Sequence, residues 1–169
     1  MHNRNGFTML EVLVVLTMLS AIIATMVGIL GNGSANRQAE NNAMKLMNDF
    51  SSIEMAFNNY RQEKQGAIPV SLGDATFVPV YLFPPKADID KGFTNPTSGT
   101  DGYLLGSNSN GNYICAQAGY SDTIAATAVE LQKKVPAMKV IVNSGCPSTT
   151  TALPANGTVS FTYWILRTS

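Results

Sequence analysis

The first long feature of the chain is a segment in which apolar residues follow one another almost without interruption. Residues 7–30 (FTMLEVLVVLTMLSAIIATMVGIL) carry a single charge, that of Glu11. A helix of this length extends about 36 Å, more than the roughly 30 Å hydrocarbon core of a bilayer. The pattern therefore predicts a membrane-spanning helix over residues 7–30.

Glu11 is the residue that does not fit this segment. A carboxylate near the middle of a bilayer costs about 2.5–3.5 kcal/mol, so it is expected to have a cationic partner there. The alternative is a Glu11 that lies near the interface and reaches out to water. Because Arg4 precedes the segment and no charge follows Glu11 until Arg37, a cytoplasmic N-terminus and an exported C-terminal domain are favoured. A cleavable Sec signal is less fitting, because its apolar region is shorter and carries no acid.

A second, amphipathic pattern follows over residues 31–66. Glycines at 28, 31 and 33 predict a flexible point in the helix, because each disfavours helix by roughly 1 kcal/mol relative to alanine. Beyond them an apolar stripe recurs at alternating spacings of four and three: Ala39, Ala43, Leu46, Phe50, Ile53, Phe57 and Tyr60. The spacing predicts one nearly continuous helix from Phe7 to about Lys64, ended by Gly66 and Pro69. We expect its second half to pack against a sheet rather than to form a coiled coil.

The remaining residues predict a connecting region and then a sheet. Residues 67–101 hold five of the eight prolines, so they are expected to form loops, with at most a short edge strand at 76–82. In residues 102–169 the predicted strands cover 103–105, 112–116, 138–143 and 158–167. A helix over 123–135, capped by Ser121 or Asp122, lies between them. The predicted fold class is α+β, a long N-terminal helix packed on a C-terminal antiparallel sheet.

Composition excludes several classes of function. The 169 residues include 11 basic and 11 acidic side chains without a block of one sign, so no nucleic-acid contact is indicated. His2 is the only histidine, which argues against Ser-His-Asp and Cys-His catalysis and against histidine metal sites. The aspartates at 88, 90 and 101 lack calcium-loop spacing and are expected to be solvated. We therefore predict no enzyme, no metal and no cofactor, although a Ser-Lys catalytic pair stays open without any residue that recommends it.

Cys115 and Cys146 are the only two cysteines. An even pair in an exported domain favours a disulfide, which would stabilise the domain by roughly 3–4 kcal/mol. Two buried thiols are the alternative, and the spacing excludes a CxxC redox site. A disulfide-bounded region within residues 102–169 is thus expected.

The beginning of the chain resembles a known signal. The run Gly6-Phe7-Thr8-Met9-Leu10-Glu11-Val12, after a short basic leader over residues 1–6, is similar to the class III signal of type IV prepilins and of type II secretion pseudopilins. The resemblance covers about the first thirty residues. It implies that prepilin peptidase cuts between Gly6 and Phe7 and methylates the new Phe7 amine. It also implies that Glu11 pairs with the Phe7 amine of a neighbouring subunit during assembly.

The resemblance carries further expectations about fold and function. It implies a pilin fold and a structural subunit that polymerises with itself into a type IV pilus used for adhesion, motility, DNA uptake or conjugation. The precursor would lie in the inner membrane with a cytoplasmic N-terminus, meet the pilus assembly machinery there, and end in an extracellular pilus. The alternatives are a minor pilin, a pseudopilin of a type II secretion system, a single-span membrane enzyme and a secreted binding module. The disulfide-bounded region favours a pilin over a pseudopilin.

Overall fold

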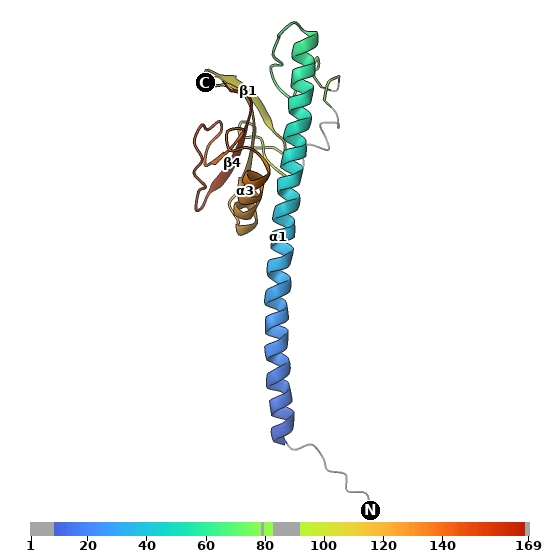
Figure 1. The fold of residues 1–169 in the computed structure, drawn as a ribbon, viewed down its shortest axis with the longest axis vertical. Helices are drawn as coiled ribbons and strands as arrows, with labels where there is room; N and C mark the ends of the chain where they lie inside the picture. Colours follow the sequence, from blue (N-terminus) through green and yellow to red (C-terminus); the bar gives the residue numbers. More distant parts are fainter. Residues whose placement is uncertain (1–8, 79, 83–91, 168–169) are drawn as a thin grey trace, which may run out of the picture. The chain divides into compact units, whose positions relative to one another are not determined.

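The computed structural model describes residues 9–78, 80–82 and 92–167, and within the long helix it describes side chains from Gly33 onward (Figure 1). The chain divides into two compact units, Met1–Arg37 and Gln38–Ser169. The described part of the first unit is helix. The elements in chain order are α1 (Met9–Glu63), β1 (Leu104–Asn108), β2 (Gly111–Gly119), α3 (Asp122–Lys134), β3 (Val140–Asn143) and β4 (Thr158–Arg167).

Helix α1 confirms the long helix predicted from the sequence. It continues through the glycines at 28, 31 and 33 without a break and ends one residue before the predicted Lys64. The helix ends near Gly66, as predicted. Gln65 and Gly66 adopt φ angles of 53° and 92°, and the Gly66 N–H donates to the Arg61 carbonyl at 2.7 Å. A left-handed residue after the last turn lets the chain leave the helix while its carbonyls stay hydrogen-bonded.

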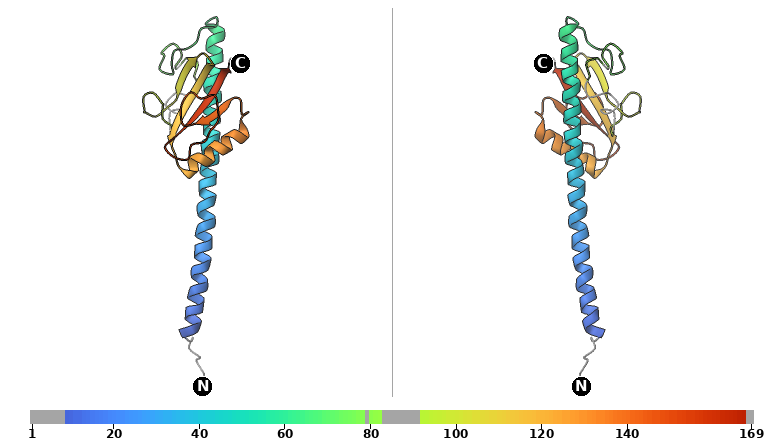
Figure 2. Two further views of the ribbon diagram at one scale, coloured as in Figure 1. Left: turned by 90° about the vertical axis from the view of Figure 1, so that its left-hand side faces the viewer. Right: turned by 90° about the vertical axis from the view of Figure 1, so that its right-hand side faces the viewer.

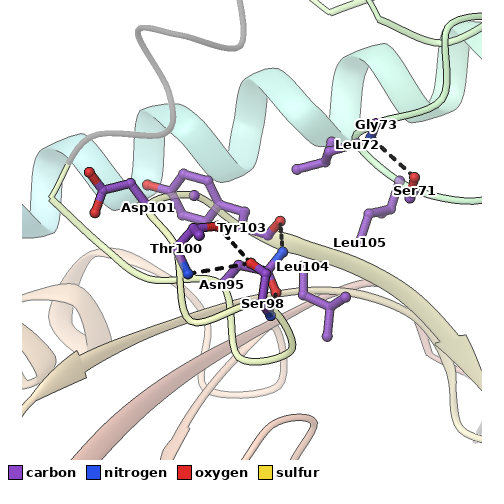
Figure 3. A pocket seen from close by; sticks show the side chains of 11 residues that line it. Ser71, Leu72, Gly73, Asn95, Ser98, Thr100, Asp101, Tyr103, Leu104 and Leu105 are labelled. Carbon is purple, nitrogen blue, oxygen red and sulfur yellow. Dashed lines mark hydrogen bonds between the residues drawn. The ribbon is translucent and has the colours of Figure 1, made fainter.

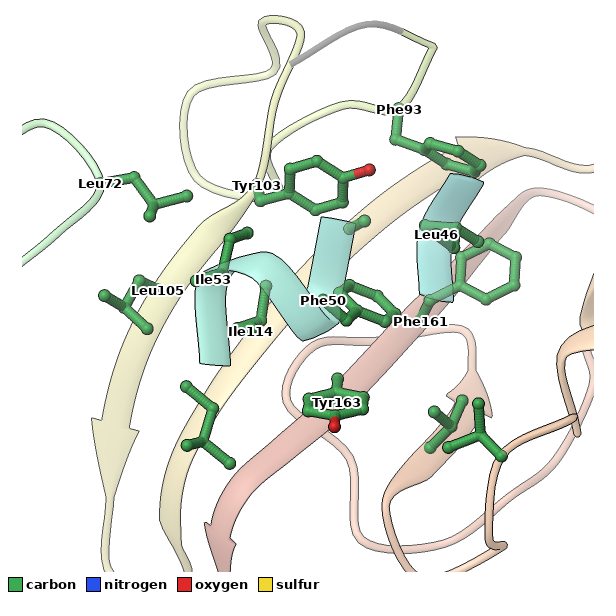
Figure 4. Packing of buried hydrophobic residues seen from close by; sticks show 14 of the residues in the cluster. Leu46, Phe50, Ile53, Leu72, Phe93, Tyr103, Leu105, Ile114, Phe161 and Tyr163 are labelled. Atoms are coloured by element: carbon green, nitrogen blue, oxygen red, sulfur yellow. The ribbon is translucent and has the colours of Figure 1, made fainter. Parts of the chain in front are cut away.

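The apolar stripe of α1 is buried as predicted. The side chains of Ala39, Ala43, Leu46, Phe50, Ile53 and Phe57 are fully buried, and that of Tyr60 nearly so. Most of them belong to one hydrophobic cluster with residues of β1, β2, β3 and β4 (Figure 4). The part of α1 that belongs to the second unit is therefore the central helix of the domain. Figure 2 shows the strands and α3 beside it in two views.

The sheet has four antiparallel strands in the order β1-β2-β4-β3. Helix α3 begins after Ser121, whose hydroxyl accepts from the Ile124 N–H at 3.2 Å, so the predicted cap is confirmed. Strand β4 has the predicted bounds. Strand β3 begins two residues later than predicted, because the Lys139 N–H turns back to the Pro136 carbonyl at 2.8 Å. The predicted fold class, α+β with a long helix packed on an antiparallel sheet, is confirmed.

The hairpin of β1 and β2 is longer than the sequence suggested. Residues 106–111 were expected to be a loop, but Gly106 pairs with Tyr113 and Asn108 with Gly111. Only Ser109 and Asn110 form the turn. The glycines permit this pairing, because a Cβ on Gly106 would lie 2.6 Å from the Tyr113 ring and one on Gly111 would lie 1.9 Å from the Leu166 carbonyl oxygen. Low strand propensity is therefore overridden here by close packing.

The connecting region holds turns rather than a regular strand. Residues 75–78 and 80–81 form turns, so the optional edge strand at 76–82 is not formed in the part of this segment that the structure describes. Phe77 and Leu82 still enter the main hydrophobic cluster. Further along, Thr94 pairs with Gln117 of β2 through two backbone hydrogen bonds of 2.8 and 2.9 Å.

Candidate functional site

The predicted processing and assembly residues lie at the very start of the chain. Gly6 and Phe7 lie outside the described residues, as does the side chain of Glu11, whose backbone belongs to α1. Cleavage after Gly6 and pairing of Glu11 therefore stay predictions. The structure does show that the helix bearing Glu11 is continuous with the helix that packs on the sheet.

The predicted membrane span also stays a prediction. Within the part of the chain whose side chains are described, no helix is both long and apolar enough to cross a membrane. Residues 7–30, where the span was predicted, lie outside that part.

The contact between α1 and the sheet is built around Phe50. Its ring stacks on Tyr163 of β4, with centroids 5.1 Å apart and planes at 29°. It also meets the edge of Tyr103, just before β1, at 5.8 Å and 71°. Aromatic pairs of this kind contribute about 0.5–1.5 kcal/mol beyond the area they bury. We call Phe50, Tyr103 and Tyr163, together with the carboxylates of Asp49 and Glu54 that bind the two tyrosine hydroxyls, the Phe50 cluster.

One of the two carboxylates is buried beside Tyr103. The Tyr103 hydroxyl donates to Asp49 Oδ2 at 2.5 Å, and Lys45 Nζ lies 2.6 Å from the same oxygen. Asp49 is only 7% exposed. Asp49 does not belong to the apolar stripe of α1, and its contact with Tyr103 is not visible in the local sequence pattern, because Tyr103 lies 54 positions along the chain. A buried carboxylate held by charge-assisted hydrogen bonds resists displacement, because breaking the contact strands a charge.

The second carboxylate, that of Glu54, links α1 to β4 and to the residue just before β3. Lys139 Nζ, just before β3, lies 2.8 and 3.0 Å from the two oxygens of Glu54 and 3.1 Å from the Tyr163 hydroxyl. The Tyr163 hydroxyl in turn donates to Glu54. Burial, and then the hydrogen bond to Glu54, raise the pKa of Tyr163, and the hydrogen bond to Glu54 raises the pKa of Lys139. The phenol therefore stays neutral and the lysine charged near neutral pH.

The predicted disulfide is confirmed, and it lies on the face of the sheet that points away from α1. Cys115 of β2 is bonded to Cys146, with Cα atoms 6.1 Å apart, and no free cysteine is found among the described residues. The disulfide belongs to a second, smaller cluster with Tyr113, Ile141 and Trp164. Trp164 follows Tyr163 in β4 and therefore points to the opposite face, where it is buried and donates from Nε1 to the Ser148 carbonyl at 3.1 Å.

A cavity lies between the connecting region and the start of β1. It has a volume of about 210 Å³ and is lined by residues 71–73, by part of the loop 95–102, and by Tyr103, Leu104 and Leu105 (Figure 3). Asp101 is its single charged lining residue. Across the described residues there is no group of three or more His, Cys, Asp or Glu side chains that could hold a metal ion.

The beginning of the chain matches a known family model. Residues 1–27 match the family model described as the prokaryotic N-terminal methylation motif, which confirms the resemblance found in the first thirty residues. No curated protein matches. A solved structure that is similar is the major type IV pilin PilA1 from Clostridium difficile, with 17% identity and a TM-score of 0.49, over 78% of this chain and 98% of that chain.

Proposed function

We propose that this chain is a structural subunit of a type IV pilus, a pilin that polymerises through its N-terminal helix. The observation that carries the proposal is the methylation motif over residues 1–27, which continues into the helix that organises the exported domain. In this role the protein is a building block and not an enzyme. Its partners would be prepilin peptidase, the inner-membrane pilus assembly machinery and further copies of itself.

The proposed assembly chemistry rests on three residues. Cleavage between Gly6 and Phe7 creates an ammonium group at Phe7, one helical turn from Glu11. This cation is the kind of partner that an intramembrane carboxylate requires. If the Glu11 of an entering subunit pairs with the Phe7 ammonium of its neighbour, a misplaced subunit strands a buried charge at a cost of about 3–5 kcal/mol. The pair would therefore fix the step between successive subunits.

The exported domain would form the outside of the filament. The Phe50 cluster fixes the sheet to α1, so force along the helix reaches the sheet through buried polar contacts as well as apolar ones. The disulfide and the loop over Trp164 cover the outer face of the sheet. The precursor would lie in the inner membrane with a cytoplasmic N-terminus, and the filament would stand at the cell surface.

A pseudopilin of a type II secretion system, or a minor pilin, is the alternative, since both use the same N-terminal chemistry. The disulfide-bounded outer region favours the pilin. A secretion assay distinguishes a pseudopilin from a pilin. Loss of a pseudopilin stops the export of other proteins, whereas loss of a pilin removes surface filaments.

The test is the intact mass and N-terminal sequence of the protein recovered from material sheared off the cell surface. We expect a chain that begins at Phe7 with one extra methyl group. We also expect that Glu11→Ala abolishes filaments while cleavage continues. Glu63→Ala, at an exposed position at the other end of α1, is the matched control and should leave filaments intact. A surface protein that keeps Met1, or that begins near Ala24, would refute the proposal.

A further inference from the structure

Asparagine is followed directly by glycine at several places in the chain, and this dipeptide is chemically labile. The steps are Asn5-Gly6, Asn32-Gly33, Asn110-Gly111 and Asn156-Gly157. Asparagine is a thermolabile residue, and a following glycine has no Cβ to keep its backbone nitrogen away from the asparagine side chain. Asn5-Gly6 lies outside the described residues and belongs to the predicted leader. The backbone settings of the other three glycines differ.

Two of these glycines hold their backbone N–H in a hydrogen bond. Gly33 lies inside α1, where each N–H is donated to the carbonyl four residues before it. Gly111 closes the two-residue turn between β1 and β2, so its N–H is donated to its partner Asn108. A Cβ on Gly111 would lie only 1.9 Å from the Leu166 carbonyl oxygen. The nitrogen of either glycine can therefore react only after the surrounding structure opens locally.

The Asn156-Gly157 step lies in the loop just before β4, and both residues are exposed. Gly157 has a φ of 79°, and a Cβ there would meet no atom within 4 Å. Across the described residues, neither the Gly157 N–H nor the Asn156 side chain has a hydrogen-bond partner. The Gly157 carbonyl, in contrast, accepts from the Tyr120 N–H at 2.7 Å. The fold thus holds Gly157 by its carbonyl and leaves its nitrogen free.

We propose that Asn156 is a site of spontaneous deamidation, which converts its side-chain amide to a carboxylate. The Gly157 nitrogen gives its proton to hydroxide and bonds to Asn156 Cγ, and the side-chain nitrogen takes a proton from water and leaves as ammonia. A second water then opens the five-membered succinimide. Breaking the new Cγ–N bond gives aspartate, and breaking the original peptide bond gives isoaspartate. The net reaction exchanges water for ammonia, and nothing is oxidised or reduced.

The reaction changes both the charge and the backbone at one end of the sheet. The full sequence carries 11 basic and 11 acidic side chains, so one further carboxylate shifts a balanced charge by one unit. Isoaspartate also lengthens the main chain by one methylene group just before Thr158, which pairs with Gly119 at the end of β2. The bond from Tyr120 to Gly157 lies beside that pair, so isoaspartate should weaken it. This site does not depend on the filament role.

The first test needs no variant. The full-length processed chain is incubated in a non-ionic detergent and mildly alkaline buffer, and mass spectrometry with electron-transfer fragmentation measures aspartate and isoaspartate at each asparagine. We expect the acid form at Asn156 to appear at least about tenfold faster than at Asn110 or Asn32, because the latter sites must open first. In urea, where the hairpin is unfolded, the rates at Asn156 and Asn110 should agree within about threefold. The rate at Asn156 should rise with pH, because hydroxide removes the attacking proton.

Variants show that the charge change arises at Asn156. Asn156→Gln keeps an amide, but its longer side chain forms the ring poorly, so the acidic species seen by isoelectric focusing after incubation should disappear. Asn110→Gln is the matched control and should leave that species unchanged. In the incubated wild type, the isoaspartate form should show faster amide hydrogen exchange at Tyr120. Asn156→Asp, which has the charge but a normal backbone, should not.

Three results would overturn the proposal. The first is an acid form at Asn156 that appears no faster than at Asn110 in the folded chain, or a difference that urea leaves in place. The second is an acidic species that persists in Asn156→Gln. The third is a glycan on Asn156 in protein recovered from the cell surface, because residues 156–158 (Asn-Gly-Thr) also fit the N-glycosylation sequon and a glycosylated amide is not free to leave as ammonia.

Discussion

The hydroxyl of Tyr103 offers the sharpest test of the contact between helix and sheet. Tyr103→Phe keeps the ring against Phe50 but removes the donor that reaches Asp49 Oδ2 at 2.5 Å. Hydrogen bonds to charged groups contribute about 1.5–3 kcal/mol, and Asp49 is only 7% exposed, so water replaces the lost donor poorly. We expect the free energy of unfolding to fall by about 2 kcal/mol, which lowers Tm by roughly 6–10 °C for a unit of this size.

The assay is urea unfolding of the full chain in detergent, followed by the fluorescence of Trp164, the single tryptophan, which is buried. Tyr120→Phe is the control, because Tyr120 is exposed on the surface and its substitution should cost less than about 0.5 kcal/mol. Asp49→Asn and the double variant complete a cycle. A coupling energy of about 1 kcal/mol or more between Asp49 and Tyr103 is expected. A loss in Tyr103→Phe no greater than that in Tyr120→Phe would show that the contact does not stabilise the domain.

Three further predictions address the sheet. Cys115→Ser with Cys146→Ser should lower the free energy of unfolding by about 3–4 kcal/mol, measured by urea unfolding; a loss below about 1 kcal/mol would contradict the assigned role. Because the folded pKa values of Lys139 and Tyr163 are raised, their contribution is complete below their unfolded values of 10.5 and 10.0 and is lost as pH rises beyond them. Thermal unfolding scanned upward from pH 8 should show a falling Tm, and a flat profile would refute this. Gly111→Ala, at φ 128° with its Cβ 1.9 Å from a backbone oxygen, should cost at least about 2 kcal/mol, whereas Gly119→Ala, at an open position, should cost less than about 1 kcal/mol.

Much of the fold follows from local patterns in the sequence. The stripe from Ala39 to Tyr60 predicts both the helix and its buried face, since each apolar residue lies three or four positions from the next. Gly66 marks the helix end, because glycine tolerates the left-handed conformation found there. Alternation in β4 predicts its two faces, with Phe161 toward α1 and Trp164 on the side of the disulfide. In each case the physical cause acts within a few residues.

The features that the sequence did not reveal depend on partners far along the chain. Asp49 and Glu54 look like solvent-facing charges when only α1 is considered. Their partners outside α1 lie 54 and 85 to 109 positions away, and only the folded sheet brings them together. The length of the β1–β2 hairpin was missed for a related reason. Gly106 and Gly111 indicate a loop by propensity, but each is a place where another part of the chain comes too close for a side chain.

The polar members of the Phe50 cluster resolve an ambiguity that the apolar stripe leaves open. A stripe with residues every three or four positions is nearly self-similar, so the helix could shift along the sheet by one turn, about 5.4 Å, and still bury apolar groups. The hydrogen bond of Asp49 to Tyr103 and those of Glu54 to Lys139 and Tyr163 have no equivalent after such a shift. The buried Asp49 would then lose Tyr103 and keep only Lys45 of its own helix, and the partly buried Glu54 would lose both of its partners, at a cost of a few kcal/mol in total. In the proposed filament a load acts along α1, which is the direction of that shift, and the two carboxylates on either side of Phe50 oppose it.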